Sequence, residues 1–169
     1  MNRSETSMYF VTGASGKLGQ LVAAELAKHA APGSVTLGSR DIGKLEPFAR
    51  QGFRTAIFDF DKPQSMHVAL AGHDRLLMIS GDSPNEKRIA QHKAAIDAAK
   101  AAGIKTIVYT SFTNAGAESL FTFARVHAAT EAYLKASGHA YIFLRDNQYA
   151  ENLTSALAHA KETGTLAVY

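Results

Sequence analysis

The stretch "VTGASGKLGQLVAAEL", Val11 to Leu26, decides how this chain folds. Its three glycines, Gly13, Gly16 and Gly19, form the pattern G-x-x-G-x-x-G and follow the apolar run "MYFVTG". After them, apolar residues recur at the spacing of one helix face, at Leu18, Leu21, Val22 and Leu26. The stretch therefore predicts a strand, a tight turn and a helix.

The same alternation repeats along the chain. Further strand-like runs are "SVTLGS", "RTAIFDF", "RLLMIS", "KTIVYTS" and "AYIFLR", separated by helix-period segments at 41–50, 64–71, 84–102 and 120–137. Such alternation is typical of β-α-β units, whose crossovers are right-handed. It predicts an α/β fold, a doubly wound parallel (Rossmann) sheet with helices on both faces. Ligands of this fold bind at the carboxyl ends of the strands.

Length and composition limit the class of protein. The 169 residues suit one domain, preceded by a polar extension at 1–7. The chain has no cysteine, no long apolar run and no secretory signal, so we expect a cytoplasmic protein without disulfides or a membrane span. The net charge of +3 comes from scattered residues, which does not favour nucleic-acid binding.

No metal site is predicted, because no group of His, Asp or Glu has the spacing of metal ligands. The one pair that draws attention, His92 and Asp97, is interpreted as ordinary helix surface.

The glycine pattern has two interpretations, a phosphate-binding loop or a plain structural corner. Its place in the first β-α unit favours phosphate binding, because the free N–H groups and the dipole of the following helix attract anions. Gly13 then permits the turn, Gly16 lets the backbone approach a pyrophosphate, and Gly19 lets the helix pack on the sheet. We predict a dinucleotide contact from Gly13, Ala14, Ser15, Gly16, Lys17 and Leu18, although Lys17 can equally be a solvated side chain.

The end of the second predicted strand indicates which dinucleotide binds. An acidic residue there would bind the ribose of NAD, but the chain has Arg40, whose guanidinium suits a 2′-phosphate. NADP(H) is therefore predicted over NAD(H), with Lys44 as support and Asp41 as a helix N-cap. After the third strand, Asp59 and Phe60 are candidates for the adenine, with Phe60 equally interpretable as a core residue.

Three further stretches give the chain a specific resemblance: "LLMISG", "AAKAAGIKTIVYTS" and "YIFLRDNQYAENL". With the glycine loop and Arg40, they resemble the atypical short-chain dehydrogenases, and within them the NmrA-like group that contains type-two NAD(P)H:quinone oxidoreductases and triphenylmethane dye reductases. The resemblance implies that Ser80 and Gly81 line the path of the ribose and nicotinamide. It also implies that the stretch Asp146 to Glu151 closes over the nicotinamide, with Asp146, Asn147 and Tyr149 as cofactor contacts. It also implies that 151–169 begin a C-terminal substrate lobe that is otherwise absent, with "TLAVY" as an unfinished strand that could pair in a homodimer.

The resemblance also bears on the chemistry. Ordinary short-chain dehydrogenases use a Tyr-x-x-x-Lys pair as proton donor, and here Phe123 and His127 occupy those places. Such a loss implies an acceptor that takes hydride without a tyrosine acid, such as a quinone or a cationic dye. His127 can contact the nicotinamide ribose, supply a proton, or be a helix histidine bonded to a carbonyl.

Four other residues are candidates near the strand ends. Ser111 or Thr110 is expected to face the substrate, and Tyr149 to bond the acceptor or to be a buried structural residue. Arg145 is expected to be a structural anchor beneath the cleft.

Two functions follow. The first is an NADPH-dependent reductase that transfers hydride to a quinone-like or other electron-poor small molecule. The second is an NADP(H)-binding redox sensor without turnover.

Overall fold

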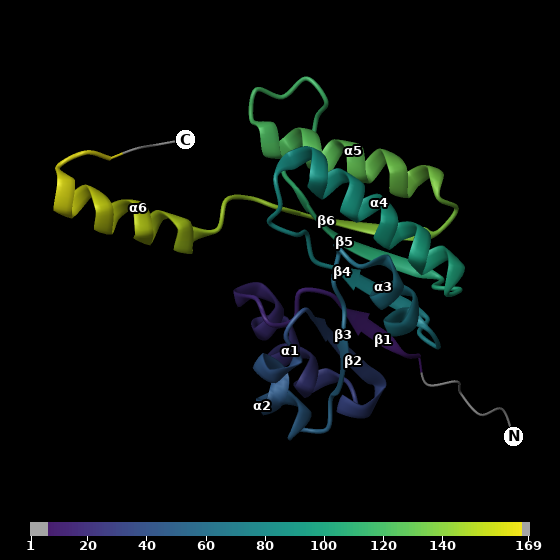
Figure 1. Ribbon diagram of the computed structural model, residues 1–169. Coiled ribbons are helices and arrows are strands. Elements are labelled where there is room, and N and C mark those ends of the chain that lie inside the picture. The colour runs from purple at the N-terminus through teal and green to yellow at the C-terminus, as the bar shows by residue number, and fades with distance from the viewer. Residues whose placement is uncertain (1–6, 167–169) are drawn as a thin grey trace, which may run out of the picture.

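Six parallel strands form a single sheet in the computed structural model, which describes residues 7–166 except for the side chains at 152 and 155. The sheet order is β3-β2-β1-β4-β5-β6 (Figure 1). The strands are β1 (Tyr9–Val11), β2 (Val35–Ser39), β3 (Arg54–Ile57), β4 (Arg75–Met78), β5 (Thr106–Phe112) and β6 (Ala140–Asp146). Because the chain order reverses beside β1, this is the predicted doubly wound sheet.

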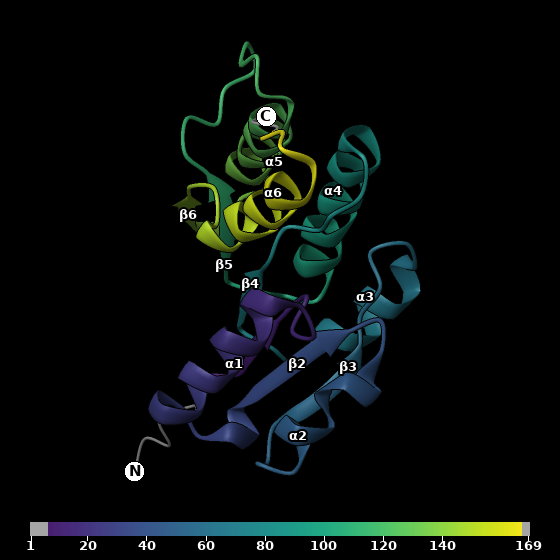
Figure 2. The same ribbon diagram turned by 90° about the vertical axis from the view of Figure 1, so that its left-hand side faces the viewer.

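Helices cover both faces of the sheet, as predicted (Figures 1 and 2). The helices of the chain are α1 (Lys17–His29), α2 (Glu46–Ala49), α3 (Pro63–Leu70), α4 (Asn85–Ala101), α5 (Thr122–Ala136) and α6 (Ala150–Thr163), with short 3-10 turns at Pro32–Ser34 and Ile42–Leu45. Adjacent strand residues serve opposite faces: Phe10 packs with α3 and α4, whereas Val11 packs with α1. The chain therefore has two apolar cores, one on each side of the sheet.

Most element ends follow the sequence signals. Gly103 and Gly138 follow α4 and α5 with φ angles of 77° and 88°, the left-handed conformation in which glycine ends a helix. The strand predicted for 54–60 is shorter, because β3 ends at Ile57. Phe58 turns its ring into the core, and Asp59 then accepts a bond from the Asp61 N–H at 3.0 Å, which begins a turn.

The C-terminal helix α6 projects from the body of the molecule (Figure 1). Gly164 ends it in the left-handed conformation, and Thr165 and Leu166 are not in a strand. Of the strand predicted at 165–169, the last three residues lie outside the described range, as do residues 1–6 of the predicted extension. Strand β6 exposes Ile142 and Leu144, by 52% and 43%.

Candidate cofactor and acceptor site

The glycine loop joins β1 to α1 where the strand order reverses. Gly13 has a φ of 60°, so its backbone is in the region that only glycine enters freely, and the Gly16 N–H donates to the Gly13 carbonyl at 3.0 Å. The Ala14 N–H donates to the Gly38 carbonyl of β2 at 3.0 Å, which holds the loop against the neighbouring strand. The loop is therefore a tight turn fixed at the carboxyl edge of the sheet.

The first turn of helix α1 packs closely against this loop because Gly19 has no side chain. A Cβ at Gly19 would lie 2.3 Å from the Gly13 carbonyl oxygen and 2.6 Å from the Ala14 Cα. Gly16, in contrast, is an exposed residue at the N-cap of α1. The third glycine of the pattern thus serves packing, and the second leaves the backbone open to a ligand.

The start of α1 fits a phosphate. No side chain caps the helix at Gly16, and its first turn contains no acidic residue. The first N–H groups of the helix and the positive end of its dipole therefore remain available to an anion. Lys17 is exposed at the first helical position, and Leu18 is half-buried.

Ser39 connects the loop to the end of β2. Its hydroxyl lies 2.8 Å from that of Ser15 and accepts a bond from the Asp41 N–H at 3.0 Å. Arg40, between Ser39 and Asp41, is exposed on the same edge as the loop. The Asp41 carboxylate accepts from the Gly43 N–H at 3.0 Å, so it caps the 3-10 turn, as predicted. These contacts hold the residues on either side of Arg40, Ser39 and Asp41, next to the glycine loop.

The segment after β3 and the segment after β4 come close to each other, at Phe60 and Gly81. A Cβ at Gly81 would lie 3.9 Å from the ring of Phe60, and that ring packs edge-on against Phe58 with centroids 5.2 Å apart. Phe60 is therefore both part of the core and next to Gly81. The Asp59 carboxylate accepts a hydrogen bond from the nearby Asp61 N–H and lies 3.7 Å from the Lys62 ammonium. The Ser80 N–H donates to the Thr110 hydroxyl oxygen at 2.9 Å.

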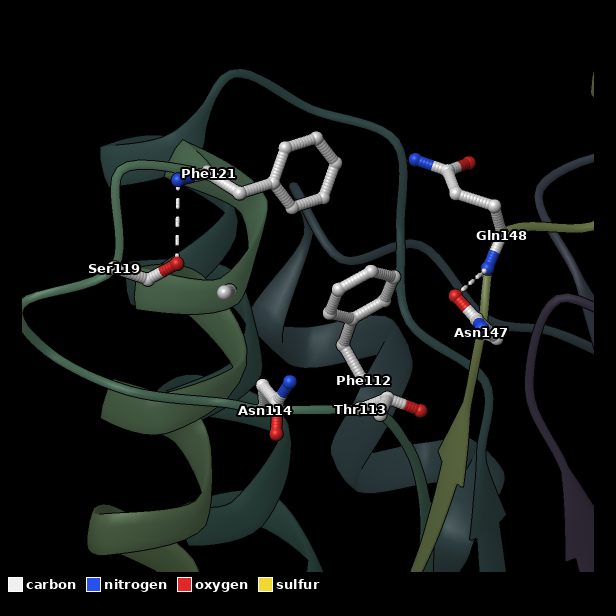
Figure 3. A pocket seen from close by; sticks show the side chains of 8 residues that line it. Phe112, Thr113, Asn114, Ser119, Phe121, Asn147 and Gln148 are labelled. Atoms are coloured by element: carbon white, nitrogen blue, oxygen red, sulfur yellow. Dashed lines mark hydrogen bonds between the residues drawn. The ribbon is translucent and has the colours of Figure 1, made fainter.

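A hollow of about 360 Å³ lies beyond the carboxyl ends of β5 and β6. Figure 3 shows the rings of Phe112 and Phe121 on one side of it and Asn147 and Gln148 on the other. Its lining residues are Phe112, Thr113, Asn114, Ser119, Phe121, Ala124, Asn147 and Gln148. The two rings are 5.2 Å apart, so the hollow combines an aromatic wall with side-chain amides. That combination suits a flat ring that carries hydrogen-bonding atoms.

Of the stretch Asp146 to Glu151, expected to close over the nicotinamide, Asn147 and Gln148 line this hollow. Tyr149 is 43% exposed, which is contrary to the alternative of a buried structural tyrosine. Its hydroxyl donates to the Asp146 carboxylate at 3.0 Å, and burial followed by that bond raises the pKa of Tyr149 to about 12. Tyr149 therefore holds its proton at neutral pH.

Ser111 and Thr110 do not face an open cleft. Ser111 is buried, and its hydroxyl donates to the Glu131 carboxylate at 2.6 Å. Thr110 is also buried, and its hydroxyl oxygen accepts the bond from the Ser80 N–H. Arg145 forms two bonds to the same carboxylate, at 2.9 and 2.7 Å, in agreement with its expected structural role. Burial raises the pKa of Glu131, but the bonds from Arg145 and Ser111 outweigh it and keep that pKa below its usual range. The expected contact of Ser111 with substrate is therefore replaced by a structural bond.

His127 lies against Phe112 of the aromatic wall. Its ring stacks on Phe112, with centroids 6.0 Å apart, and its Nδ1 is 2.8 Å from the Tyr109 hydroxyl. Burial, and then the positive charge of Arg88, lower the pKa of His127 to about 4. The histidine is neutral at pH 7, so it does not fit the expected role of proton source. Its partner is a phenol rather than the carbonyl of the alternative interpretation.

His92 was predicted to lie on the helix surface, and this is wrong, because it is fully buried. Its Nε2 accepts from the Gly81 N–H at 3.2 Å, and its Nδ1 is 3.0 Å from the Thr130 hydroxyl. The sequence signal was weak because the buried stripe of α4 contains one large apolar residue, Ile96, and otherwise alanines and polar residues, which do not mark a core face. Tyr109 was also missed, since one tyrosine in an apolar run predicts only a core strand.

The sheet, the uncapped helix after a glycine loop and the exposed Arg40 define the nucleotide-binding Rossmann class of proteins. Residues 13–166 match the protein family described as NAD(P)H-binding, and the chain belongs to that family.

Individual relatives are reductases by name. Quinone oxidoreductase 2 of Escherichia coli (strain K12) is 36% identical over 157 residues, which are 93% of this chain and 54% of the relative. An NmrA-like family domain-containing oxidoreductase of Aspergillus flavus is 29% identical over 163 residues, 94% of this chain and 53% of the relative. The structure of Citrobacter sp. triphenylmethane reductase complexed with NADP(H) superposes with a TM-score of 0.85 at 34% identity, covering 92% of this chain and 55% of that one.

The chain therefore spans about half the length of these relatives. Within residues 7–166, no group of three His, Asp or Glu side chains is placed to hold a metal ion, and no helix is long and apolar enough to cross a membrane.

Proposed function

We propose that this chain is the cofactor-binding part of an NADPH-dependent reductase of quinone-like or other electron-poor acceptors. The observation that carries the proposal is an uncapped glycine loop bonded to the end of β2 at Ser39, which the exposed Arg40 directly follows. Two similar proteins add support, because E. coli quinone oxidoreductase was solved with NADPH and the Citrobacter dye reductase with NADP(H).

The residues proposed to hold the cofactor lie near the carboxyl ends of β1 to β4. The backbone from Gly13 to Leu18 binds the pyrophosphate, and Arg40 pairs with the 2′-phosphate, with Lys44 exposed nearby in sequence. Phe60 and Gly81 border the path from adenine to ribose. When bound, the nicotinamide supplies a hydride.

The acceptor would occupy the hollow between Phe112, Phe121 and Asn147. Phe123 has no hydroxyl, Ser111 is bonded to Glu131 and His127 is neutral, so these residues offer no acid in the place where ordinary short-chain dehydrogenases have one. Such a site favours acceptors that take hydride readily over simple ketones. The lack of an acid at this place would also suit the second hypothesis, an NADP(H)-binding sensor.

Steady-state consumption of NADPH in the presence of duroquinone, a tetramethyl benzoquinone, tests the proposal. We expect oxidation that requires both protein and quinone and is faster with NADPH than with NADH. Saturable NADPH binding without quinone-dependent oxidation would overturn the reductase proposal in favour of the sensor.

The oligomer and the division into domains are also proposals. Residues 1–169 are proposed as one Rossmann domain whose last part, from 151, leads into a substrate lobe. A homodimer is proposed in which a second copy covers the exposed face of β6 at Ile142 and Leu144.

A further inference from the structure

A chain of hydrogen bonds leads from the loop after β4 to His127. Its members are the Gly81 N–H, His92 of α4, Thr130 of α5, Tyr109 of β5 and His127 of α5. His92 and Tyr109 are fully buried, and Thr130 has no exposed surface either. Such a network has few alternative arrangements, because each buried polar atom needs a partner.

The donors fix the position of each proton. The Gly81 N–H can only donate, so the Nε2 of His92 must accept, and the proton of this neutral ring lies on Nδ1. That proton points to the Thr130 oxygen at 3.0 Å, which is free to accept because the Thr130 hydroxyl donates to the Val126 carbonyl at 2.9 Å. The network therefore begins with a histidine in one tautomer.

Tyr109 determines the tautomer of His127 through the next hydrogen bond. Its hydroxyl lies 3.4 Å from the protonated Nδ1 of His92 and 2.8 Å from the Nδ1 of His127. The phenol proton is therefore donated to His127, whose Nδ1 accepts and whose own proton lies on Nε2. The ring cannot rotate freely, since it stacks on Phe112 and contacts Tyr109 with centroids 5.7 Å apart.

The Nε2–H of His127 is the open end of the chain. Within residues 7–166, no hydrogen bond is formed by it. His127 is 8% exposed, and its Nε2 is not among the fully buried side-chain atoms that lack a partner in that range, so this nitrogen retains a small exposed surface. Phe112, on which the His127 ring stacks, lines the hollow. Ala124, one helical turn before His127, lines it as well.

We propose that His127 is a hydrogen-bond donor for the acceptor molecule, presenting a neutral Nε2–H to a carbonyl oxygen, and that His92 and Tyr109 are positioning residues that hold this tautomer. The inference rests on the proposed reductase function. His127 transfers no proton in this role, and it favours acceptors with a neutral oxygen at the position it reaches.

Nitrogen NMR of labelled histidine rings tests the tautomers in the wild-type protein without any turnover. We expect the proton on Nε2 in His127 and on Nδ1 in His92 at pH 7. In the Tyr109→Phe variant the His127 ring should become a mixture of tautomers. With NADP⁺ present, duroquinone should shift the Nε2–H signal of His127. The proton on Nδ1 of His127 in the wild type, or an Nε2–H signal unmoved by saturating quinone, would overturn the proposal.

Kinetics give a second, independent measurement. His127→Phe should lower kcat/KM for duroquinone about tenfold, whereas His127→Gln, whose amide can donate from a similar position, should stay within about threefold of wild type. His67→Gln on the exposed surface of α3 is the matched control and should change nothing. Equal losses in the Phe and Gln variants would refute the donor role. If the wild type oxidises no NADPH, the proposed function fails, while the NMR measurements still decide the tautomer and the contact.

Discussion

Arg40 is the residue that should separate the two nicotinamide cofactors. Arg40→Ala removes a charge-assisted pair with a 2′-phosphate, so NADPH affinity should fall about 10- to 100-fold while NADH affinity changes little. Fluorescence titration with both cofactors measures this. Arg50→Ala is a suitable control, because Arg50 is exposed at the end of α2 and pairs only with the exposed Glu46 in the described contacts. Equal losses for NADPH and NADH would count against the 2′-phosphate contact.

The two buried histidines should make stability depend on pH. Burial lowers the pKa of His92 to about 3, helped by His127 and Arg88, and that of His127 to about 4, helped by Arg88 and opposed by Glu131. Both values lie below the unfolded value near 6.5, so the unfolded chain binds more protons and stability falls as the pH drops from about 6.5 toward 4.

Denaturant unfolding at a series of pH values checks this dependence. The slope should reach about 1.4 kcal/mol per pH unit for each histidine in this window. His127→Gln should remove about half of it, and the exposed His67→Gln should leave it unchanged. A stability that is flat between pH 6.5 and 5 would contradict the buried, neutral state of the pair.

At the level of elements, the contact between α1 and the glycine loop depends on Gly19. Gly19→Ala places a Cβ against backbone atoms of Gly13 and Ala14, which cannot move aside as a flexible side chain would. We expect a loss of about 1–3 kcal/mol in the free energy of unfolding, together with weaker NADPH binding.

Gly33→Ala is the matched control for this substitution. Nothing lies within 4 Å of a Cβ at Gly33, and its position in the 3-10 turn Pro32–Ser34 is compatible with alanine. The variant should therefore be neutral or about 0.4–1 kcal/mol more stable, because alanine restricts the unfolded chain. Thermal unfolding of both variants separates the outcomes, and a similar loss in both would show that Gly19 is not a special contact.

How far the sequence predicts each element depends on the strength of the local signal. The glycine loop, the α4 and α5 boundaries at Gly103 and Gly138, and the Asp41 cap were predictable because glycine conformation and capping are local properties. The burial of His92 was not, since it depends on where α4 and α5 meet. The bond between Ser111 and Glu131 joins residues that are 20 apart in sequence and was equally invisible.

The whole molecule exposes one flank of its sheet at β6. Ile142 is 52% exposed, whereas its register neighbour on β5, Val108, is half-buried and Ile107 is fully buried. In an isolated copy, Ile142→Ala should cost less than about 1 kcal/mol, and Ile107→Ala about 2–5 kcal/mol.

Denaturant unfolding at several protein concentrations measures both costs. If Ile142→Ala costs as much as Ile107→Ala and stability rises with concentration, a second copy covers this flank. Costs that match the exposure at every concentration would contradict the proposed homodimer through β6.

The position of β1 has a consequence for how the protein is made. This strand of three residues is synthesised before both of the strands with which it pairs, β2 on one side and β4 on the other. Its second edge therefore stays unpaired until Met78 has been synthesised, at about 5–20 residues per second. For those seconds of translation the nascent chain presents an open strand edge, and a chaperone that binds extended apolar segments would find Phe10 and Val11 there.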